Sequence, residues 1–331
     1  MKAVILVGGE GTRLRPLTFT TPKSMLPVAG QPIIERVVRW LAAYGIDQAV
    51  LSLGYRPDAF LVAFPEGQCA NVGLTYAVEP EPLGTAGGIA FAARQAGLDE
   101  TFLVVNGDVL TDLDLGELIT LHQNRGAAAT IALTPVEDPS RYGVVPTDDR
   151  SRVTAFIEKP PGDEAPTNLI NAGTYVLQPE VLDHVPPGRA VSIERETFPA
   201  LVANGEVYAL GSDAEWIDAG TPATYLEVNL TYAAREHSWV SPTARLDSLA
   251  RVRDTVVAEG VKVEAGAEVT GSLLLDGAVI GPDAVVVESI VGPHANVGPA
   301  ARLQSLSVLG AGAVVEPGSS LSGARVPQAE S

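Results

Sequence analysis

The sequence has little cysteine, few basic residues and no long hydrophobic run. Cys69 is the only cysteine among 331 residues, which excludes an intrachain disulfide and a zinc site built from several cysteines. Lys and Arg number 22 against 40 Asp and Glu, and the formal net charge of −18 argues against nonspecific binding of nucleic acid or of an anionic membrane. No apolar stretch approaches the length of a membrane span, and the apolar N-terminal run is too short for a signal peptide. We therefore expect a cytoplasmic protein.

A glycine-rich run near the N-terminus is the most informative stretch. Residues 3–7 are all apolar and predict a buried parallel strand. Three glycines follow within four residues: Gly8, Gly9 and Gly11. They allow the backbone to turn sharply, and the N–H groups of such a loop can surround phosphate oxygens. Three cations come next: Arg13, Arg15 and Lys23. The run predicts a binding site for a nucleoside triphosphate.

The spacing distinguishes this loop from two common phosphate loops. A Walker loop needs Lys-Ser/Thr directly after its glycines, whereas Lys23 and Ser24 follow Pro22. The dinucleotide spacing G-x-G-x-x-G is also absent. The run G-G-E-G-T-R-L followed by P-K instead resembles the signature of the sugar-1-phosphate nucleotidyltransferases, or NDP-sugar pyrophosphorylases. The alternative is a glycine-rich turn of an unrelated α/β domain.

The first two-thirds of the chain alternate strand-like and helix-like segments. Apolar residues at helical spacing from Ile33 to Leu41 predict a helix that ends before Gly45. Further strands are predicted over residues 48–53, 101–105 and 128–136. The alternation predicts a Rossmann-like, mostly parallel sheet with helices on both faces, whose ligands bind at the carboxyl ends of the strands. Asp108, which follows one strand, would then lie near the glycine loop.

A six-residue apolar period replaces this pattern in the C-terminal part. The period runs through Val291, Val297, Leu303, Leu309, Val315 and Leu321, and earlier through Val257, Val263, Val269 and Leu275, with one short step at Ile280. It predicts a left-handed parallel β-helix of hexapeptide repeats, because a loop-rich β-sandwich would not hold the phase. We expect a catalytic domain over residues 1–235, a linker over 236–256, the β-helix over 257–326 and a tail over 327–331. The β-helix is the expected surface of homo-oligomer contact.

Two aspartates resemble the metal-binding residues of the family: Asp108 in N-G-D and Asp218 in W-I-D-A-G-T. Two highly anionic reactants repel each other, and a bound Mg²⁺ ion usually neutralises part of this charge. We therefore expect Mg²⁺ as the cofactor. By charge and by the resemblance, Arg13 would contact the β/γ-phosphates and Lys23 the α-phosphate region. These four are the expected catalytic residues. The alternative for each aspartate is a turn or helix cap, which is how we interpret Asp114.

Three later segments resemble the sugar-phosphate site of the family. In Glu158-Lys159-Pro160, Lys159 would bind the phosphate and Glu158 the sugar hydroxyls. The amide of Asn171 would bind a hydroxyl, and the backbone at Gly143 would meet the sugar. A solvated surface pair is the alternative interpretation of Glu158 and Lys159.

Residues 78–88 resemble the nucleobase loop of the family. An ionised carboxylate only accepts hydrogen bonds, and guanine offers two adjacent donors, whereas thymine and uracil offer one donor between two acceptors. Glu79 therefore favours guanine if it meets the base, and is otherwise a solvated turn residue. The other nucleotide contacts that the resemblance implies are Leu6, Gly8, Gly9, Gly11, Thr12, Gly84 and Thr85.

The segment S-I-E-R-E-T-F-P, residues 192–199, resembles that of the GDP-mannose pyrophosphorylases. Its Glu194 would reach the sugar, although Ser192 as a helix cap explains the same residues. The resemblance implies GTP and α-D-mannose 1-phosphate as substrates and GDP-mannose and pyrophosphate as products. Three alternatives stay open. They are glucose 1-phosphate with dTTP, UTP or ATP; a hexapeptide acyltransferase, for which His294 is the only histidine in the repeats; and a non-catalytic regulatory subunit.

Overall fold

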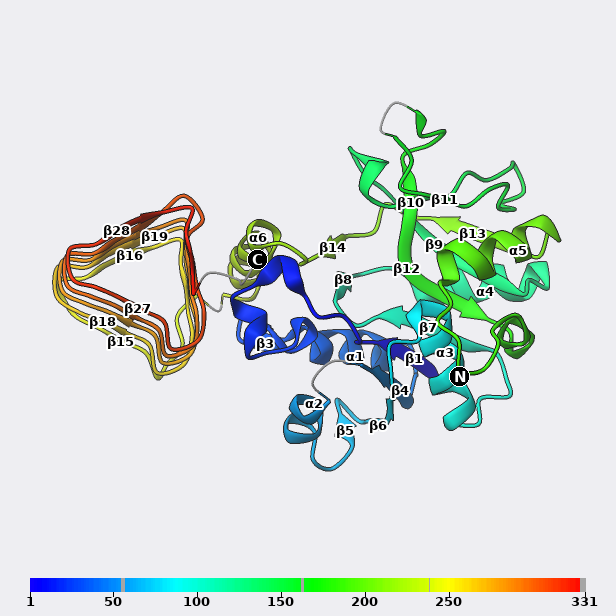
Figure 1. The fold of residues 1–331 in the computed structure, drawn as a ribbon, viewed down its shortest axis with the longest axis horizontal. Coiled ribbons are helices and arrows are strands. Elements are labelled where there is room, and N and C mark those ends of the chain that lie inside the picture. Colours follow the sequence, from blue (N-terminus) through cyan, green and yellow to red (C-terminus); the bar gives the residue numbers. More distant parts are fainter. Residues whose placement is uncertain (55–56, 162–163, 238, 328–331) are drawn as a thin grey trace. The chain divides into compact units, whose positions relative to one another are not determined.

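The computed structural model describes residues 1–54, 57–161, 164–237 and 239–327, which pack as two compact units (Figure 1). Unit 1 comprises Met1–Gly9 and Ile34–Trp216, and unit 2 comprises Glu10–Ile33 and Ile217–Ser331. The glycine-rich run therefore begins in unit 1 and continues in unit 2. All but the first residue of the predicted tail lies outside the described residues.

The centre of unit 1 is a parallel sheet of four strands in the order β7-β1-β4-β6. The strands are β1 (Ala3–Leu6), β4 (Gln48–Leu53), β6 (Val72–Val78) and β7 (Phe102–Asn106). Strands β1, β4 and β7 are almost wholly apolar and buried along most of their length, as expected of parallel strands covered on both faces. The predicted strands and the predicted helix, α1 (Ile33–Ala43), agree with the structure to within two residues at each end.

One long strand makes the sheet mixed rather than uniformly parallel. Strand β12 (Leu169–Leu177) runs antiparallel both to β7 and to β9 (Ala129–Pro135), and β13 (Val207–Gly211) lies parallel to β9. A strand buried on both faces has the same apolar composition in either direction, so the sequence pattern did not reveal the reversal. The expectation of a Rossmann-like sheet with helices is confirmed, with this addition.

Helices and short strands complete unit 1. Helix α3 packs on β1, β4 and β6, and α4 packs on β9, β12 and β13. Among the described residues, no helix combines the length and the apolarity needed to cross a membrane. The bounds of these elements are α2 (Asp58–Ala63), α3 (Gly84–Gln95), α4 (Leu115–Arg125), α5 (Phe198–Ala203), β5 (Gln68–Cys69), β8 (Val109–Thr111), β10 (Gly143–Val144) and β11 (Ile157–Glu158).

The C-terminal part of unit 2 is a β-helix with three sides, seen as a triangle in Figure 1. Each side is a parallel sheet of five strands, in the orders β15-β18-β21-β24-β27, β16-β19-β22-β25-β28 and β17-β20-β23-β26-β29. This confirms the predicted β-helix. Its strands are β15 (Arg245–Leu246), β16 (Arg251–Arg253), β17 (Val256–Val257), β18 (Lys262–Val263), β19 (Glu268–Thr270), β20 (Leu273–Leu274), β21 (Val279–Ile280), β22 (Val285–Val287), β23 (Ile290–Val291), β24 (Asn296–Val297), β25 (Arg302–Gln304), β26 (Val308–Leu309), β27 (Val314–Val315), β28 (Ser320–Ser322) and β29 (Arg325–Val326).

The phase of the repeat differs from the predicted one. Leu274, and not Leu275, belongs to the core of the β-helix, where it pairs with Val257 and Val291. The first coils advance by 17 residues and not by 18, so every third inward step is five residues long. Parallel pairing begins with an isolated bridge between Val240 and Val257 and continues in β15 from Arg245, both inside the segment predicted as a linker. A sequence period read without the coil boundaries cannot place these short steps.

The rest of unit 2 is built around helix α6 (Pro222–Glu236), which contacts β2 (Pro27–Val28), β17 and β20. Strand β2 pairs with β3 (Gln31–Pro32). The hydroxyl of Tyr225 donates to the carbonyl oxygen of Pro27 at 2.6 Å, and the side-chain oxygen of Asn229 accepts from the N–H of Ala29 at 3.0 Å. Burial raises the pKa of Tyr225, which keeps this hydroxyl a donor. Helix α6 therefore ties residues 10–33 to the β-helix.

Leu274→Ala should destabilise the β-helix, because it leaves a cavity in a stacked column in which Leu274 and its neighbours Val257 and Val291 are at most 1% exposed. We expect a loss of about 2–5 kcal/mol in the free energy of unfolding, measured by denaturant titration. Leu249→Ala is the matched control, since Leu249 is 70% exposed, and its effect should stay within about 0.5 kcal/mol. Equal losses for the two variants would contradict the stacked core.

Candidate functional site

Three of the four predicted catalytic residues meet in unit 2. The ammonium nitrogen of Lys23 lies 2.6 Å from Oδ1 of Asp218, and Nη2 of Arg13 lies 3.6 Å from Oδ2 of the same carboxylate. The side chain of Lys23 is 9% exposed and that of Asp218 is 20% exposed, whereas Arg13 is 58% exposed. Two cations therefore flank one carboxylate, and the arginine faces solvent.

Short helical turns place the two cations. Arg13 lies in a 3-10 turn over Thr12–Leu14, and Lys23 lies in another over Lys23–Met25. Gly11 precedes the first turn with a φ of 61°, a left-handed conformation that favours glycine, and its carbonyl oxygen accepts from the hydroxyl of Thr18 at 2.8 Å. This hydrogen bond ties Thr18 back to the start of the loop at Gly11.

Gly220 leaves the space in which Arg13 and Asp218 meet. A Cβ atom at this position would lie 2.8 Å from Nη2 of Arg13 and 2.8 Å from Oδ1 of Asp218. Gly220 was not singled out from the sequence, although it stands in the same A-G-T stretch as the aspartate. The close approach that it permits is visible only in the structure.

Arg15 has local partners. Its guanidinium lies 3.1 Å from a carboxylate oxygen of Glu10 and 5.5 Å from the centre of the Phe19 ring. These contacts brace the loop.

Asp108, the fourth predicted catalytic residue, lies in unit 1 after β7. The backbone of Gly107, the residue before it, packs closely against the side chain of Val7, because a Cβ on Gly107 would lie 2.3 Å from Cγ1 of Val7. The N–H of Gly107 also donates to the carbonyl oxygen of Leu6 at 2.8 Å. The half-buried Asp108 is therefore next to the carboxyl end of β1, where the glycine loop begins.

The carboxylate of Glu79 is held inside the nucleobase loop and is half-buried. Its Oε1 accepts from the hydroxyl of Ser52 at 3.0 Å, and its Oε2 accepts from the N–H of Leu83 at 3.0 Å. A Cβ on Gly8 would lie 3.9 Å from Oε1, and one on Gly88 would lie 2.7 Å from it. Glu79 braces this loop beside the first glycine of the signature, a link that the sequence did not reveal.

Thr85 joins the nucleobase loop to the segment of Glu194. Its hydroxyl donates to Oε2 of Glu194 at 2.7 Å and accepts from the N–H of Ile193 at 2.8 Å. Ser192 donates to the same carboxylate oxygen at 2.7 Å and accepts from the N–H of Arg195, so it also caps the following turn. The turn at Gly84 needs glycine, since its φ is +71° and a Cβ there would lie 2.7 Å from a carbonyl oxygen.

The predicted sugar-phosphate residues Gly143, Glu158 and Lys159 are adjacent in unit 1. Strands β10 and β11 pair Gly143 with Glu158, and a Cβ on Gly143 would lie 3.1 Å from Oε2 of Glu158. Nζ of Lys159 lies 3.4 Å from Oε1 of Glu158, and its side chain is 57% exposed. The φ of Lys159 is 50°, an uncommon left-handed conformation for a side chain of this size.

Asn171 stabilises an irregularity in β12. Its Nδ2 donates to the hydroxyl of Tyr175 at 2.8 Å, its Oδ1 accepts from the N–H of Gly173 at 2.9 Å, and the register with β9 shifts between Asn171 and Tyr175. Burial, with the charge of Glu194 as a second cause, raises the pKa of Tyr175, so the phenol stays neutral. Within the part of the chain that the structure describes, these two bonds use one donor hydrogen and one lone pair of the Asn171 amide, so one of each is left for a ligand.

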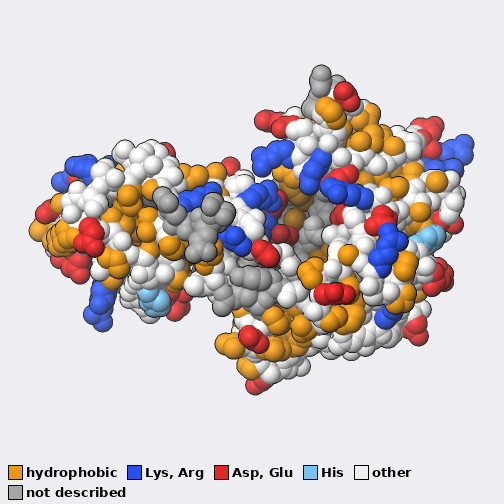
Figure 2. All heavy atoms as spheres, in the orientation of Figure 1, with side chains coloured by type: hydrophobic (Ala, Val, Ile, Leu, Met, Phe, Trp, Pro, Cys, Tyr) orange, Lys and Arg blue, Asp and Glu red, His pale blue; other side chains and the backbone are white. Residues whose placement is uncertain are grey.

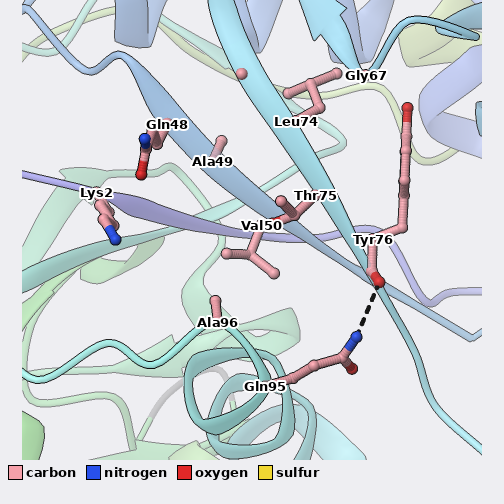
Figure 3. Close-up of a pocket in the computed structure, with 11 residues that line it drawn as sticks. Lys2, Gln48, Ala49, Val50, Gly67, Leu74, Thr75, Tyr76, Gln95 and Ala96 are labelled. Atoms are coloured by element: carbon pink, nitrogen blue, oxygen red, sulfur yellow. Dashed lines mark hydrogen bonds between the residues drawn. The ribbon is translucent and has the colours of Figure 1, made fainter.

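A cavity of about 360 Å³ lies elsewhere in unit 1, where β1 and β4 begin (Figure 3). Its lining includes Lys2, Gln48, Tyr76 and Gln95, and the amide of Gln95 donates to the backbone oxygen of Tyr76 at 3.3 Å. None of the predicted site residues belongs to its described lining.

On the face drawn in Figure 2, acidic side chains are dispersed around unit 1. The high negative charge is therefore spread out and does not form one patch there.

Comparison with known proteins shows the family to which the chain belongs. The family model described as "Nucleotidyl transferase" matches residues 2–235, and the model described as "GMPPB C-terminal domain" matches residues 234–330. A mannose-1-phosphate guanylyltransferase of Mycobacterium tuberculosis is 40% identical over 291 residues, which cover 82% of this chain and 79% of that protein.

A mannose-1-phosphate guanyltransferase of Schizosaccharomyces pombe is 42% identical over 243 residues, or 72% of this chain. The chain spans 66% of the length of that fungal relative. Among solved structures, HddC from Yersinia pseudotuberculosis complexed with GMP-PN matches with a TM-score of 0.60 and 30% identity, over 70% of this chain and 99% of that one. The protein belongs to the nucleotidyl transferase family.

Proposed function

We propose that this protein is a mannose-1-phosphate guanylyltransferase that makes GDP-mannose and pyrophosphate from GTP and α-D-mannose 1-phosphate. The carrying observation is the cluster of Lys23, Arg13 and Asp218 in a chain of the nucleotidyl transferase family. The Mycobacterium tuberculosis relative, at 40% identity, bears this activity in its name.

In the proposed reaction, a phosphate oxygen of the sugar phosphate attacks the α-phosphorus of GTP and pyrophosphate leaves. Two anions must approach each other, so positioning and charge neutralisation supply most of the catalysis. Lys23 is nearly buried and would neutralise the α-phosphate region, since a lysine held in place needs no reorganisation as charge develops. The exposed Arg13 would hold the β- and γ-phosphates.

The family uses a divalent metal ion, and we propose Mg²⁺, held by Asp108 and Asp218. The donor set fits, because carboxylate oxygens are the ligands that Mg²⁺ prefers. Among the described residues no three carboxylate, histidine or cysteine side chains gather into a metal cage. Mg²⁺ is commonly held by one or two carboxylates together with substrate phosphates and water. The metal, when bound, would screen the charge between the two substrates.

The sugar phosphate would bind at β10, β11 and β12. Lys159 has an exposed ammonium group that would bind the phosphate. Glu158 and the amide of Asn171 would bind sugar hydroxyls, and the backbone at Gly143, which lies against Glu158, would meet the sugar. We extend the proposal to the predicted nucleotide contacts Leu6, Gly8, Gly9, Gly11, Thr12, Gly84 and Thr85. The cytoplasmic setting, the domain division at residue 235 and homo-oligomer contact through the β-helix also stay proposals.

Guanine is the proposed base. The bound GMP-PN of the structural neighbour HddC is a guanine nucleotide, which supports this choice for a related fold. Glu79 lies beside Gly8, the first glycine of the signature. Ser52 and Leu83 each use one lone pair of its carboxylate. The other lone pairs would accept both guanine donors. Glucose 1-phosphate with another nucleotide remains the alternative of the same reaction class.

Purified protein with Mg²⁺ should release pyrophosphate fastest from GTP with mannose 1-phosphate. The measurement crosses GTP, ATP, UTP and dTTP with mannose 1-phosphate and glucose 1-phosphate. Turnover centred on dTTP or UTP with glucose 1-phosphate would retain the reaction class and overturn the proposed substrates. Absence of turnover in every combination would favour the regulatory-subunit alternative.

Lys23→Met should lower kcat/KM by about 100- to 1,000-fold, because it removes a fixed charge that stabilises the transferring phosphates. The variant keeps an unbranched side chain of similar size but removes the ammonium group that lies 2.6 Å from Asp218. Lys262→Met is the control, since Lys262 is exposed on the β-helix and should keep wild-type rates. The thermal midpoint is measured alongside, so that unfolding is not mistaken for lost catalysis. A near-normal rate in Lys23→Met would contradict the assigned role.

Glu79→Gln should separate base recognition from bracing of the loop. If the carboxylate reads guanine, kcat/KM for GTP falls about tenfold or more while the low activity with other nucleotides changes little. Ser52→Ala is the matched control, because it removes a hydrogen bond to Glu79 and leaves the charge in place. An equal loss for all nucleotides in Glu79→Gln would show that Glu79 only braces the loop.

A further inference from the structure

The last coil of the β-helix holds the loop that carries Arg13 and Arg15. Arg325, in β29, donates from Nη1 to the carbonyl oxygen of Arg13 at 2.9 Å and to that of Arg15 at 2.9 Å. All three residues belong to unit 2. Both acceptors are backbone atoms and the donor is charged, so the contact fixes the path of the loop rather than the side chains that it presents.

Arg325 stands at the end of a column of aliphatic residues on one side of the β-helix. Arg325 pairs with Val308, the residue at the same position of the preceding strand. The side chains at this position point away from the β-helix core, because the next residue in each strand belongs to the core and successive side chains of a strand point to opposite faces. These outward residues are nevertheless no more than 3% exposed: Val256, Leu273, Ile290 and Val308. This side is therefore covered, and only its last position carries a charge.

The cover consists of parts of unit 2 itself. Helix α6 contacts the first two strands of this side, β17 and β20. At the other end Gly310, which follows β26, lies against Pro16, because a Cβ on Gly310 would come within 3.0 Å of the Cβ of Pro16. Pro16 and the carbonyl groups bound by Arg325 belong to one loop. The β-helix thus supports the signature loop by an apolar contact and by a charged one.

We propose that Arg325 is a positioning residue of the nucleotide site. It holds the backbone on both sides of Leu14, and so keeps Arg13 within reach of Asp218. The assignment rests on the proposed function, since that loop is proposed to bind the triphosphate. It gives the β-helix a part in catalysis, whereas the sequence indicated only oligomer contact.

Hydrogen–deuterium exchange tests the support of the loop without relying on activity. Within the loop the N–H groups of Leu14, Arg15 and Phe19 are hydrogen bonded, so their exchange reports its opening. In Arg325→Ala we expect peptides over residues 12–19 to exchange about tenfold faster, with the peptides of β17, β20 and β23 unchanged. Unchanged exchange in the loop, or faster exchange throughout the β-helix, would overturn the proposal.

Kinetics give the second readout. Arg325→Ala should raise the KM for GTP about fivefold to tenfold and leave the KM for mannose 1-phosphate within about twofold, because only the triphosphate loop is loosened. Arg325→Lys keeps a charged donor and should recover part of the effect. Arg302→Ala is the matched control, since Arg302 is exposed on another side of the β-helix. Equal increases in both KM values, or an equal effect in the control, would refute a specific role.

Gly310→Ala tests the same loop from the other contact. It leaves Arg325 unchanged and presses on Pro16, so it should produce the same local increase in exchange over residues 12–19. If the wild type proves inactive with every substrate pair, the proposed function fails. The exchange data would still show whether Arg325 holds the loop. If the wild type is active and loop exchange is unaffected in both variants, only the positioning role fails.

Discussion

A single ion pair between distant parts of the chain organises the candidate site. Lys23 and Asp218 are 195 residues apart in sequence and 2.6 Å apart in space, and the lysine side chain is almost fully buried. A buried ammonium group needs a charged or hydrogen-bonding partner, because the cost of leaving water is otherwise not offset. The pair therefore couples the turn at Lys23 to the segment just before α6, and α6 in turn packs on the β-helix.

The polar residues proposed to bind substrates also hold the fold together. Glu79 accepts from Ser52 and Leu83, Thr85 joins Glu194, and Asn171 ties Tyr175 to a bulge in β12. Such groups are already oriented before a ligand arrives, which lowers the entropy lost on binding. Because these residues have both roles, a substitution at one of them affects structure and binding together. A control that changes only the supporting partner is therefore needed.

Close backbone approaches occur at three glycines, one in unit 1 and two in unit 2. Gly107 lets the end of β7 pack against Val7, and Gly220 leaves space for the contact of Arg13 with Asp218. Gly310 packs against Pro16. At each place a Cβ would fall at or within 3.0 Å of a neighbouring atom. Side chains are therefore excluded by packing at these positions, and none of the three has the positive φ that would single out glycine by conformation.

The sequence by itself determined the local pattern. The apolar runs predicted β1, β4, β7 and β9, the six-residue period predicted the β-helix, and the glycine-rich signature named the residues that meet at Asp218. These features depend on residues close together in the chain or on a fixed period, which the order of residues records directly.

Tertiary structure alone decided the rest. The antiparallel direction of β12, the five-residue steps of the coils, the hydrogen bonds of Glu79 and the contact of Arg325 with the loop 310 residues away all join distant segments. An arginine that binds two carbonyl groups has the same sequence signature as an arginine in solvent. The difference lies in which backbone packs beside it, and that is fixed only when the chain has folded.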